Sequence, residues 1–126
     1  MTDKDIYIHH FSVVAPAAII EETMRFYRDA LGIVPGFRPE FNLPGYWLYS
    51  GSNPLIHLTA KEDRDQNGSR FFHHFALRCT NYSEVIERLA SMNIEYRKLN
   101  ANDVNETQVT VIDPAGNLVE LNFEKR

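Results

Sequence analysis

Hydrophobic residues follow two different periods in the first half of the chain. Residues 6–15 are rich in Ile, Val and Phe, which is typical of a β-strand, and Pro16 ends the run. Apolar residues then recur at spacings of four, three and four, which predicts one face of an amphipathic helix: Ile20, Met24, Tyr27 and Leu31. Gly32 is the expected helix stop, because glycine adopts the left-handed conformation without steric cost.

Strand-like segments complete the first half and are separated by turns that contain Pro and Gly. They are residues 33–38, 46–50 and 55–60. The second half repeats the order, with a strand at 71–79, a helix, and then strands at 94–99, 107–112 and 118–123.

The helix of the second half has recognisable ends. Asn81 is expected to cap it, with Glu84 as the reciprocal capping partner, and it should end near Asn93. Its apolar face is predicted to consist of three residues: Val85, Ile86 and Leu89.

A short motif supports an internal repeat. His-His-Phe occurs at residues 9–11 and again at 73–75, so His10 and His74 are 64 residues apart. We therefore expect one domain over 1–126 that consists of two βαβββ modules, 1–63 and 64–126. Each half is too small to bury a core alone, so the modules must pair, within the chain or across a dimer.

Composition narrows the class of protein. The chain has 126 residues and a net charge of −4, which argues against binding to a nucleic-acid backbone. Its one cysteine, Cys79, cannot form an intramolecular disulfide, which favours a reducing compartment. The longest apolar stretch, 11–20, is too short to span a bilayer, and no basic leader precedes it. We expect a cytoplasmic protein that binds neither nucleic acids nor membranes.

Four polar side chains share one predicted sheet face. Side chains alternate along a strand, so the residues between buried apolar neighbours point away from the helices. They are His10, His57, His74 and Glu120. The repeat that relates the strands also relates these residues. A single histidine on a strand is usually a hydrogen-bonded structural residue, but four candidate ligands at repeat-related places favour a metal site.

The donor set indicates an open site. Imidazole and carboxylate suit one divalent ion such as Zn²⁺, Ni²⁺, Co²⁺, Mn²⁺ or Fe²⁺. Four ligands on a six-coordinate ion leave two positions for water or substrate, which suits stabilisation of an enediolate. A closed structural zinc site usually includes cysteine, and Cys79 is predicted to face the helices. His9 and His73 have the opposite strand parity, so they are interpreted as residues that support the ligands from outside the metal site or lie on the surface.

Two longer strings complete the pattern: E-T-M-R-F-Y-R-D-A-L-G-I at 22–33 and D-P-A-G-N-L-V-E-L at 113–121. With the repeat, they resemble the vicinal oxygen chelate superfamily, which includes glyoxalase I, bleomycin-resistance proteins and extradiol dioxygenases. The resemblance implies an α+β fold with a curved mixed sheet around a metal-binding cavity. It also implies that His10, His57, His74 and Glu120 hold the metal. A homodimer is implied, in which the two histidines of the first module meet the ligands of the second module of another chain.

The resemblance leaves the reaction open. Its first implication is a metal-dependent glyoxalase-like isomerase or lyase that acts on a small carbonyl compound through a metal-stabilised enediolate, with Glu120 as the catalytic proton carrier. The alternatives are an Fe²⁺ extradiol-type dioxygenase and a non-enzymatic binding protein of the bleomycin-resistance kind. Glyoxalase I usually carries Glu at the position of His57 and an Arg near residues 12–14. Both departures argue against glutathione-dependent chemistry.

Candidate substrate contacts lie on the strands beside the ligands. They are Trp47, Tyr49, Gln108 and Asn122, with Arg78 and Thr110 as further candidates. Core packing or a dimer contact is the alternative role for Trp47. Arg38 and Lys61 are expected to be solvent-exposed charges.

Overall fold

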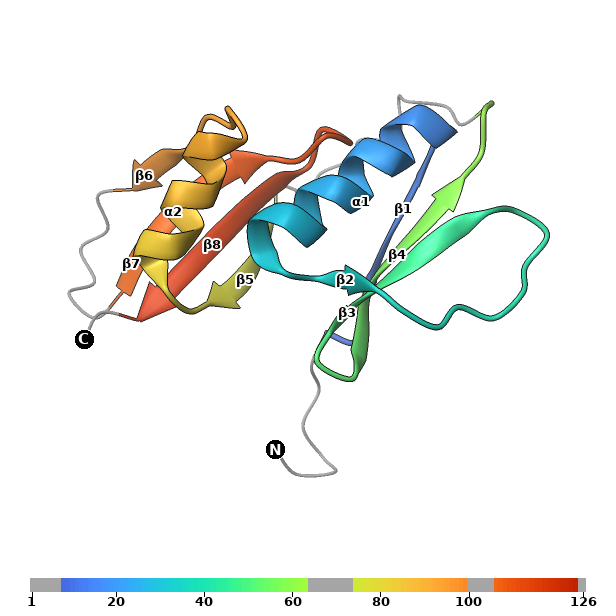
Figure 1. Ribbon diagram of the computed structural model, residues 1–126, viewed down its shortest axis with the longest axis horizontal. Coiled ribbons are helices and arrows are strands. Elements are labelled where there is room, and N and C mark those ends of the chain that lie inside the picture. Colours follow the sequence, from blue (N-terminus) through green and yellow to red (C-terminus); the bar gives the residue numbers. More distant parts are fainter. Residues whose placement is uncertain (1–7, 64–73, 100–105, 125–126) are drawn as a thin grey trace.

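The two halves of the chain fold into the same series of elements (Figure 1). The computed structural model describes residues 8–63, 74–99 and 106–124. The first module contains β1 (Phe11–Ala15), α1 (Ala17–Leu31), β2 (Val34–Pro35), β3 (Gly45–Ser50) and β4 (Asn53–Ala60). The second contains β5 (Phe75–Cys79), α2 (Tyr82–Ser91), β6 (Arg97–Leu99), β7 (Glu106–Ile112) and β8 (Leu118–Glu124). The predicted α+β fold with two βαβββ modules is confirmed.

Each module forms its own four-stranded mixed sheet. The strand orders are β1-β4-β3-β2 and β5-β8-β7-β6. The first strand of each module pairs in parallel with the last, and the remaining pairs are antiparallel. Both helices lie on the same side of the sheets (Figure 1). β1 and β5 are therefore edge strands, and their outer edges face the junction between the modules.

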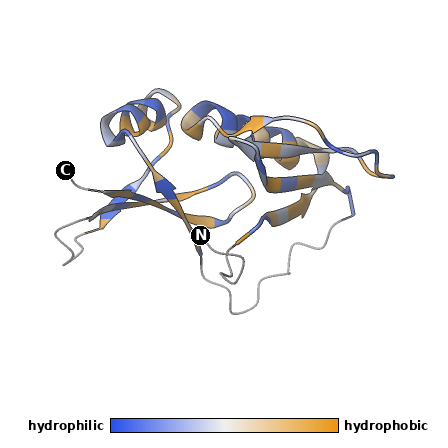
Figure 2. Ribbon diagram, turned by 90° about the horizontal axis from the view of Figure 1, so that it is seen from below, coloured by the Kyte–Doolittle hydropathy of each residue, from blue (hydrophilic) through white to orange (hydrophobic). Residues whose placement is uncertain are grey.

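Alternation along the strands builds the core, and Figure 2 shows hydrophobic and hydrophilic residues alternating along them. The helix-facing residues of both sheets are fully buried: Leu48, Ile56, Leu58, Val109, Val119 and Leu121. From α1, Ile20, Met24 and Tyr27 pack into the same core, as their spacing predicts. Gly32 ends α1 in the left-handed conformation, with φ of 70°, which confirms the predicted stop.

The structure corrects some predicted boundaries. Within the described residues the first strand begins only at Phe11, and β2 is two residues long, because little of 33–38 finds a pairing partner. The predicted cap of α2 is wrong. Asn81 has φ of 59°, whereas a capping residue needs an extended backbone, and its side chain makes no capping hydrogen bond. Glu84 pairs with Arg88 instead. His73 lies outside the described residues.

A buried polar contact joins the modules. The Tyr27 hydroxyl of α1 donates a 2.7 Å hydrogen bond to Asp113 Oδ2, in the turn before β8. Asp113 also accepts from the backbone N–H groups of Ala115 and Asn117, at 3.0 and 2.8 Å. Burial, and then the Asp113 charge, raise the pKa of Tyr27 well above its ordinary value. The two long strings noted in the sequence thus meet at a structural junction, and α1 also contacts α2.

Candidate metal centre

The first pair of candidate ligands comes from the outer and second strands of the first sheet. His57 lies on β4 between Ile56 and Leu58, both fully buried, so its ring points to the face opposite the helices. His10 directly precedes β1, and the His10 and His57 rings stack with centroids 3.8 Å apart. His57 Nε2 lies 3.0 Å from the carbonyl oxygen of Pro54, and His9 Nδ1 lies 2.9 Å from His10 Nδ1. The structure therefore brings His10 and His57 together.

The electrostatics of His57 favour a neutral ring. Burial is the main cause that lowers the pKa of His57, followed by the charge of His10, and the bond to Pro54 partly opposes them. A neutral imidazole is the form that ligates metals. The surroundings of His57 thus favour the protonation state that a metal ligand requires.

The second pair comes from the equivalent strands of the second sheet. His74 directly precedes β5, and its Nε2 lies 3.7 Å from Glu120 Oε1 on β8. Glu120 is 16% exposed and His74 38%. The buried neighbours Val119 and Leu121 turn Glu120 to the face opposite the helices, where Asn122 Nδ2 lies 3.5 Å from its Oε2. This pair supplies the carboxylate.

The four candidate ligands thus form two pairs, one per module. Within residues 8–63, 74–99 and 106–124, no three His, Cys, Asp or Glu side chains lie close enough together to hold a metal ion. The donor chemistry of the four residues fits a divalent ion, while a site with all four needs a further approach of the two sheets or a second chain.

An aromatic stack extends the first pair. Trp47 on β3 lies opposite His57 in the strand register, and their rings stack with centroids 4.0 Å apart and planes 9° apart. Phe41, from the connection between β2 and β3, lies 6.1 Å beyond Trp47. Trp47, Phe41 and His57 line a small cavity of about 290 Å³. Trp47 therefore lies where a substrate bound beside His57 would contact it.

Arg38 lines the same cavity, which corrects its expected place in solvent. It is half-buried, with its guanidinium carbon 4.7 Å from the centre of the Phe41 ring, and Nη2 donates a 3.1 Å hydrogen bond to the Leu43 carbonyl. Sequence reasoning missed Arg38 because only Val34–Pro35 of the predicted strand 33–38 is regular, so alternation gives no direction for Arg38. Lys61 is about half exposed and lies 4.0 Å from Asp63, as expected of a surface charge.

The other candidate contacts have different surroundings. The Tyr49 hydroxyl donates a 2.6 Å hydrogen bond to the Phe37 carbonyl, and its ring covers Gly36, where a Cβ atom would lie 2.7 Å from the ring. Tyr49 thus holds the chain that leads to Arg38. On the second sheet, Gln108 lies opposite Asn122, and Thr110 lies opposite Glu120, so these residues share one face.

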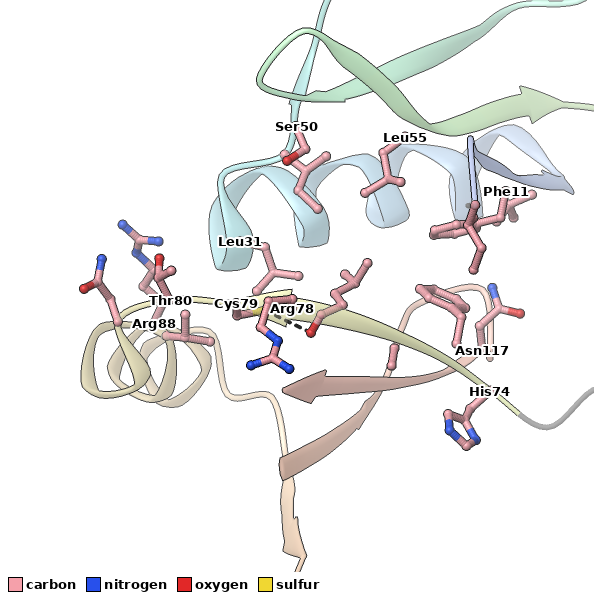
Figure 3. Close-up of a pocket in the computed structure, with 18 of the residues that line it drawn as sticks. Phe11, Leu31, Ser50, Leu55, His74, Arg78, Cys79, Thr80, Arg88 and Asn117 are labelled. Carbon is pink, nitrogen blue, oxygen red and sulfur yellow. Dashed lines mark hydrogen bonds between the residues drawn. The ribbon is translucent and has the colours of Figure 1, made fainter. Parts of the chain in front are cut away.

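A larger cleft separates the edges of the two sheets (Figure 3). Its volume is about 1250 Å³, and β1 and β5 line it. The Phe11 and Phe75 rings, which occupy equivalent positions in the two modules, lie 4.0 Å apart. Arg78 and Cys79 of β5 also line the cleft. Among the described residues, β1 and β5 each pair with only one strand, and both line this cleft.

Comparison with known proteins agrees with this architecture. The sequence profile of the Glyoxalase/Bleomycin resistance protein/Dioxygenase superfamily matches residues 7–121. Glyoxylase I 4 of Arabidopsis thaliana is 27% identical over 122 residues, which cover 90% of this chain and 68% of that protein. No helix among the described residues is long and apolar enough to cross a membrane.

Solved structures share the fold over nearly the whole chain. A glyoxalase family protein from Bacillus anthracis superposes with a TM-score of 0.77 at 25% identity, over 99% of this chain and 100% of that one. The fosfomycin resistance protein FosX from Listeria monocytogenes superposes with a TM-score of 0.71 at 13% identity, over 96% and 95% of the two chains. The profile match over residues 7–121 shows that the chain belongs to the Glyoxalase/Bleomycin resistance protein/Dioxygenase superfamily, and the two modules agree with it.

Proposed function

We propose that the protein is a metal-dependent isomerase or lyase that acts on a small carbonyl compound. One observation carries the proposal: repeat-related strands of both modules present a pair of metal-competent side chains on the face opposite the helices. The relatives named glyoxalase or glyoxylase support this class of reaction.

His10, His57, His74 and Glu120 would hold the ion, which we expect to be Ni²⁺, Zn²⁺, Co²⁺, Mn²⁺ or Fe²⁺. When bound, such an ion would act as a Lewis acid that polarises a carbonyl oxygen and stabilises an enediolate. Trp47 would orient the substrate beside His57, and Tyr49 would hold the wall of the cavity in place. Gln108 and Asn122 would offer hydrogen bonds from the second sheet.

Glu120 is the residue we assign to proton transfer. Its carboxylate is mostly buried, and Asn122 lies beside Oε2 while His74 lies beside Oε1. In a 2-hydroxy carbonyl compound, a carboxylate in this position can take the proton from the hydroxyl-bearing carbon and return it to the former carbonyl carbon. The hydroxyl proton passes to the former carbonyl oxygen, so that the carbonyl and hydroxyl groups exchange places. Its neighbours hold the carboxylate toward the polar face of the second sheet, where the transfer takes place.

We further propose that the complete site forms between two chains. The two ligand pairs are separate within the described part of the chain, and β1 and β5 each have an unpaired edge. Exposed strand edges pair readily with another chain. A homodimer joined through these edges would place His10 and His57 beside the partner subunit's His74 and Glu120.

Elemental analysis of the purified protein, together with its mass in solution, tests the metal and the dimer. We expect one divalent ion per site and the mass of two chains. Chelation should abolish carbonyl isomerisation, and Ni²⁺ or Zn²⁺ should restore it. Activity that is indifferent to chelation would overturn the proposal.

Mixed dimers test the shared site. A chain with His57→Ala and a chain with Glu120→Gln should each be inactive alone. Their heterodimer contains one intact site if the ligands come from different chains, so activity should return to about half per dimer. A heterodimer without activity, from subunits shown to be paired and folded, would place the site within one chain.

The aromatic cavity favours a second candidate, a non-enzymatic binding protein, since TnmS3 from Streptomyces, an antibiotic binding protein, shares the fold. Unchanged metal content after replacement of His57 and Glu120 would favour this function.

The Fe²⁺ dioxygenase is a further alternative, and the third histidine argues against it. Oxygen uptake with catechols only in the presence of Fe²⁺ would decide for it.

A further inference from the structure

The cavity beside His57 combines a positive charge with an aromatic wall. Arg38, Phe41, Trp47 and His57 all line it, and its volume is about 290 Å³. This volume is at the lower end of the range for small-molecule sites, so the cavity can hold only a small ligand. The lining therefore restricts both the size and the chemistry of what binds there.

Arg38 is held in place by the chain around it. Its guanidinium lies over the Phe41 ring, and Nη2 donates to the Leu43 carbonyl. Gly45 lets Nη2 approach closely, since a Cβ atom there would lie 3.1 Å from Nη2 and only 1.9 Å from the Leu58 carbonyl oxygen. The charge is thus positioned by local packing and does not depend on a mobile side chain.

Arg38 keeps unused hydrogen-bonding capacity. A guanidinium has five N–H donors, whereas the structure gives Arg38 one acceptor, and its buried Nε has no hydrogen-bond partner within the described residues. None of the ion pairs formed by described residues includes Arg38. A half-buried cation that has no counter-ion among the described residues favours binding of an anion, and arginine matches the planar geometry of a carboxylate.

Trp47 presents a flat apolar surface to the same cavity. One face of its ring is stacked on His57, with centroids 4.0 Å apart, while the Phe41 ring is tilted by 39° and its centroid lies 6.1 Å away. An aromatic wall of this kind favours a planar group in the ligand. The carboxylate would then lie at the Arg38 end of the cavity, and the planar group along Trp47.

We infer that the substrate is a small 2-oxo acid, whose carboxylate is bound by Arg38 and whose planar oxo-acid group contacts Trp47. The 2-oxo group rests on the proposed function, because the carbonyl would be the reacting group and the adjacent C3 would carry the hydrogen and hydroxyl that an enediolate requires. The carboxylate rests on Arg38 alone. Arg38 is in this view the residue that selects anionic substrates over neutral ones.

Phenylglyoxylate and its neutral methyl ester are matched probes, since both are planar 2-oxo compounds and only the first carries a carboxylate. Trp47 is the only tryptophan of the chain, so its fluorescence reports occupation of the cavity directly. Calorimetry gives the affinities independently. Both titrations use the full-length protein as purified and again after chelation, because a bound metal also attracts carboxylates.

We expect the protein to bind phenylglyoxylate at least about tenfold more tightly than the ester. Arg38→Met should weaken binding of the anion by about 10- to 100-fold, the effect of losing hydrogen bonds to a charged group, and leave the ester unchanged. Arg38→Lys should lie between, because it keeps the charge and loses the planar fork. Arg25→Met removes one positive charge from an exposed site on α1, and it should change neither affinity by more than about twofold.

Equal affinity of the unmodified protein for anion and ester would overturn the inference, as would an Arg38→Met protein that binds the anion undiminished. Arg38→Gln serves as a second neutral variant if Arg38→Met does not fold. Metal content, measured on the same samples, separates this result from the proposed function. Anion binding that depends on Arg38, in a protein that contains no metal as purified and takes up none when Ni²⁺ or Zn²⁺ is added, would uphold the carboxylate and overturn the metal chemistry.

Discussion

The two modules share one strand arrangement but carry different side chains on the sheet face opposite the helices. In the first, the position opposite His57 is Trp47, and Phe41 and Arg38 extend the wall. In the second, the position opposite Glu120 is Thr110, and Gln108 and Asn122 lie beside it. The same strand register therefore carries an aromatic and cationic surface in one half and an uncharged polar surface around a carboxylate in the other.

This difference suggests a division of labour. Flat apolar rings and a guanidinium are suited to hold a substrate, while a carboxylate among amide and hydroxyl groups is suited to move a proton. A repeat allows each copy to specialise, because the core positions facing the helices are set by packing and the opposite face is free to vary.

The largest effect is expected when one residue of each surface is replaced, because one surface should act in proton transfer and the other in substrate binding. Glu120→Gln should lower kcat by about 10²- to 10⁴-fold with a small change in KM, because proton transfer is lost while the aromatic wall remains. Trp47→Ala should mainly raise KM. Steady-state kinetics with a carbonyl substrate measure both. Glu95→Gln, at an exposed position of the second module, is the charge-matched control. A Glu120→Gln protein with changed KM and normal kcat would contradict the division.

The next effect tests whether the modules share one core. Leu58 and Leu121 occupy equivalent, fully buried positions in β4 and β8. Leu58→Ala and Leu121→Ala should each reduce the free energy of unfolding by about 2–5 kcal/mol, because each leaves a cavity. Denaturant unfolding followed by fluorescence and circular dichroism should remain one transition in both. Separate transitions for the two probes would show that the modules unfold independently.

A smaller effect tests the junction between the modules. Tyr27→Phe leaves the ring in place and removes the hydrogen bond to Asp113, so we expect a loss of about 1–3 kcal/mol in the free energy of unfolding. Tyr46→Phe removes a hydroxyl bonded to Glu21 at a more exposed site and should cost less than about 1 kcal/mol. Equal losses in the two variants would show that the junction contributes no special stability.

The smallest effect is expected at the residue that precedes each helix, where the backbones of the two modules differ. Pro16 precedes α1 with an extended backbone, whereas Asn81 precedes α2 with φ of 59°. Asn81→Gly should leave stability within about 1 kcal/mol of the original, because glycine adopts positive φ without strain. Asn81→Ala should destabilise the protein relative to Asn81→Gly in thermal unfolding. The reverse order would mean that the Asn81 side chain has a role that the structure does not show.

Some features were predictable because they are local. Spacing in α1, alternation in β4 and β8 and the left-handed Gly32 depend only on neighbouring residues, and the structure has each where the pattern predicts it. The cap at Asn81 was not predictable in this way, because Asx residues also favour the left-handed conformation. The contacts of Arg38 and the Tyr27–Asp113 bond join residues that no sequence period relates.

The sequence by itself determined the two modules, their strand faces and the chemical identity of the four candidate ligands, since periodicity and repetition are properties of the chain. Only the tertiary structure decided that these ligands form two separate pairs, that Trp47 stacks on His57 and that Arg38 enters the same cavity. The physical reason is that side-chain direction follows from local backbone geometry, whereas proximity depends on how sheets, loops and modules pack against one another.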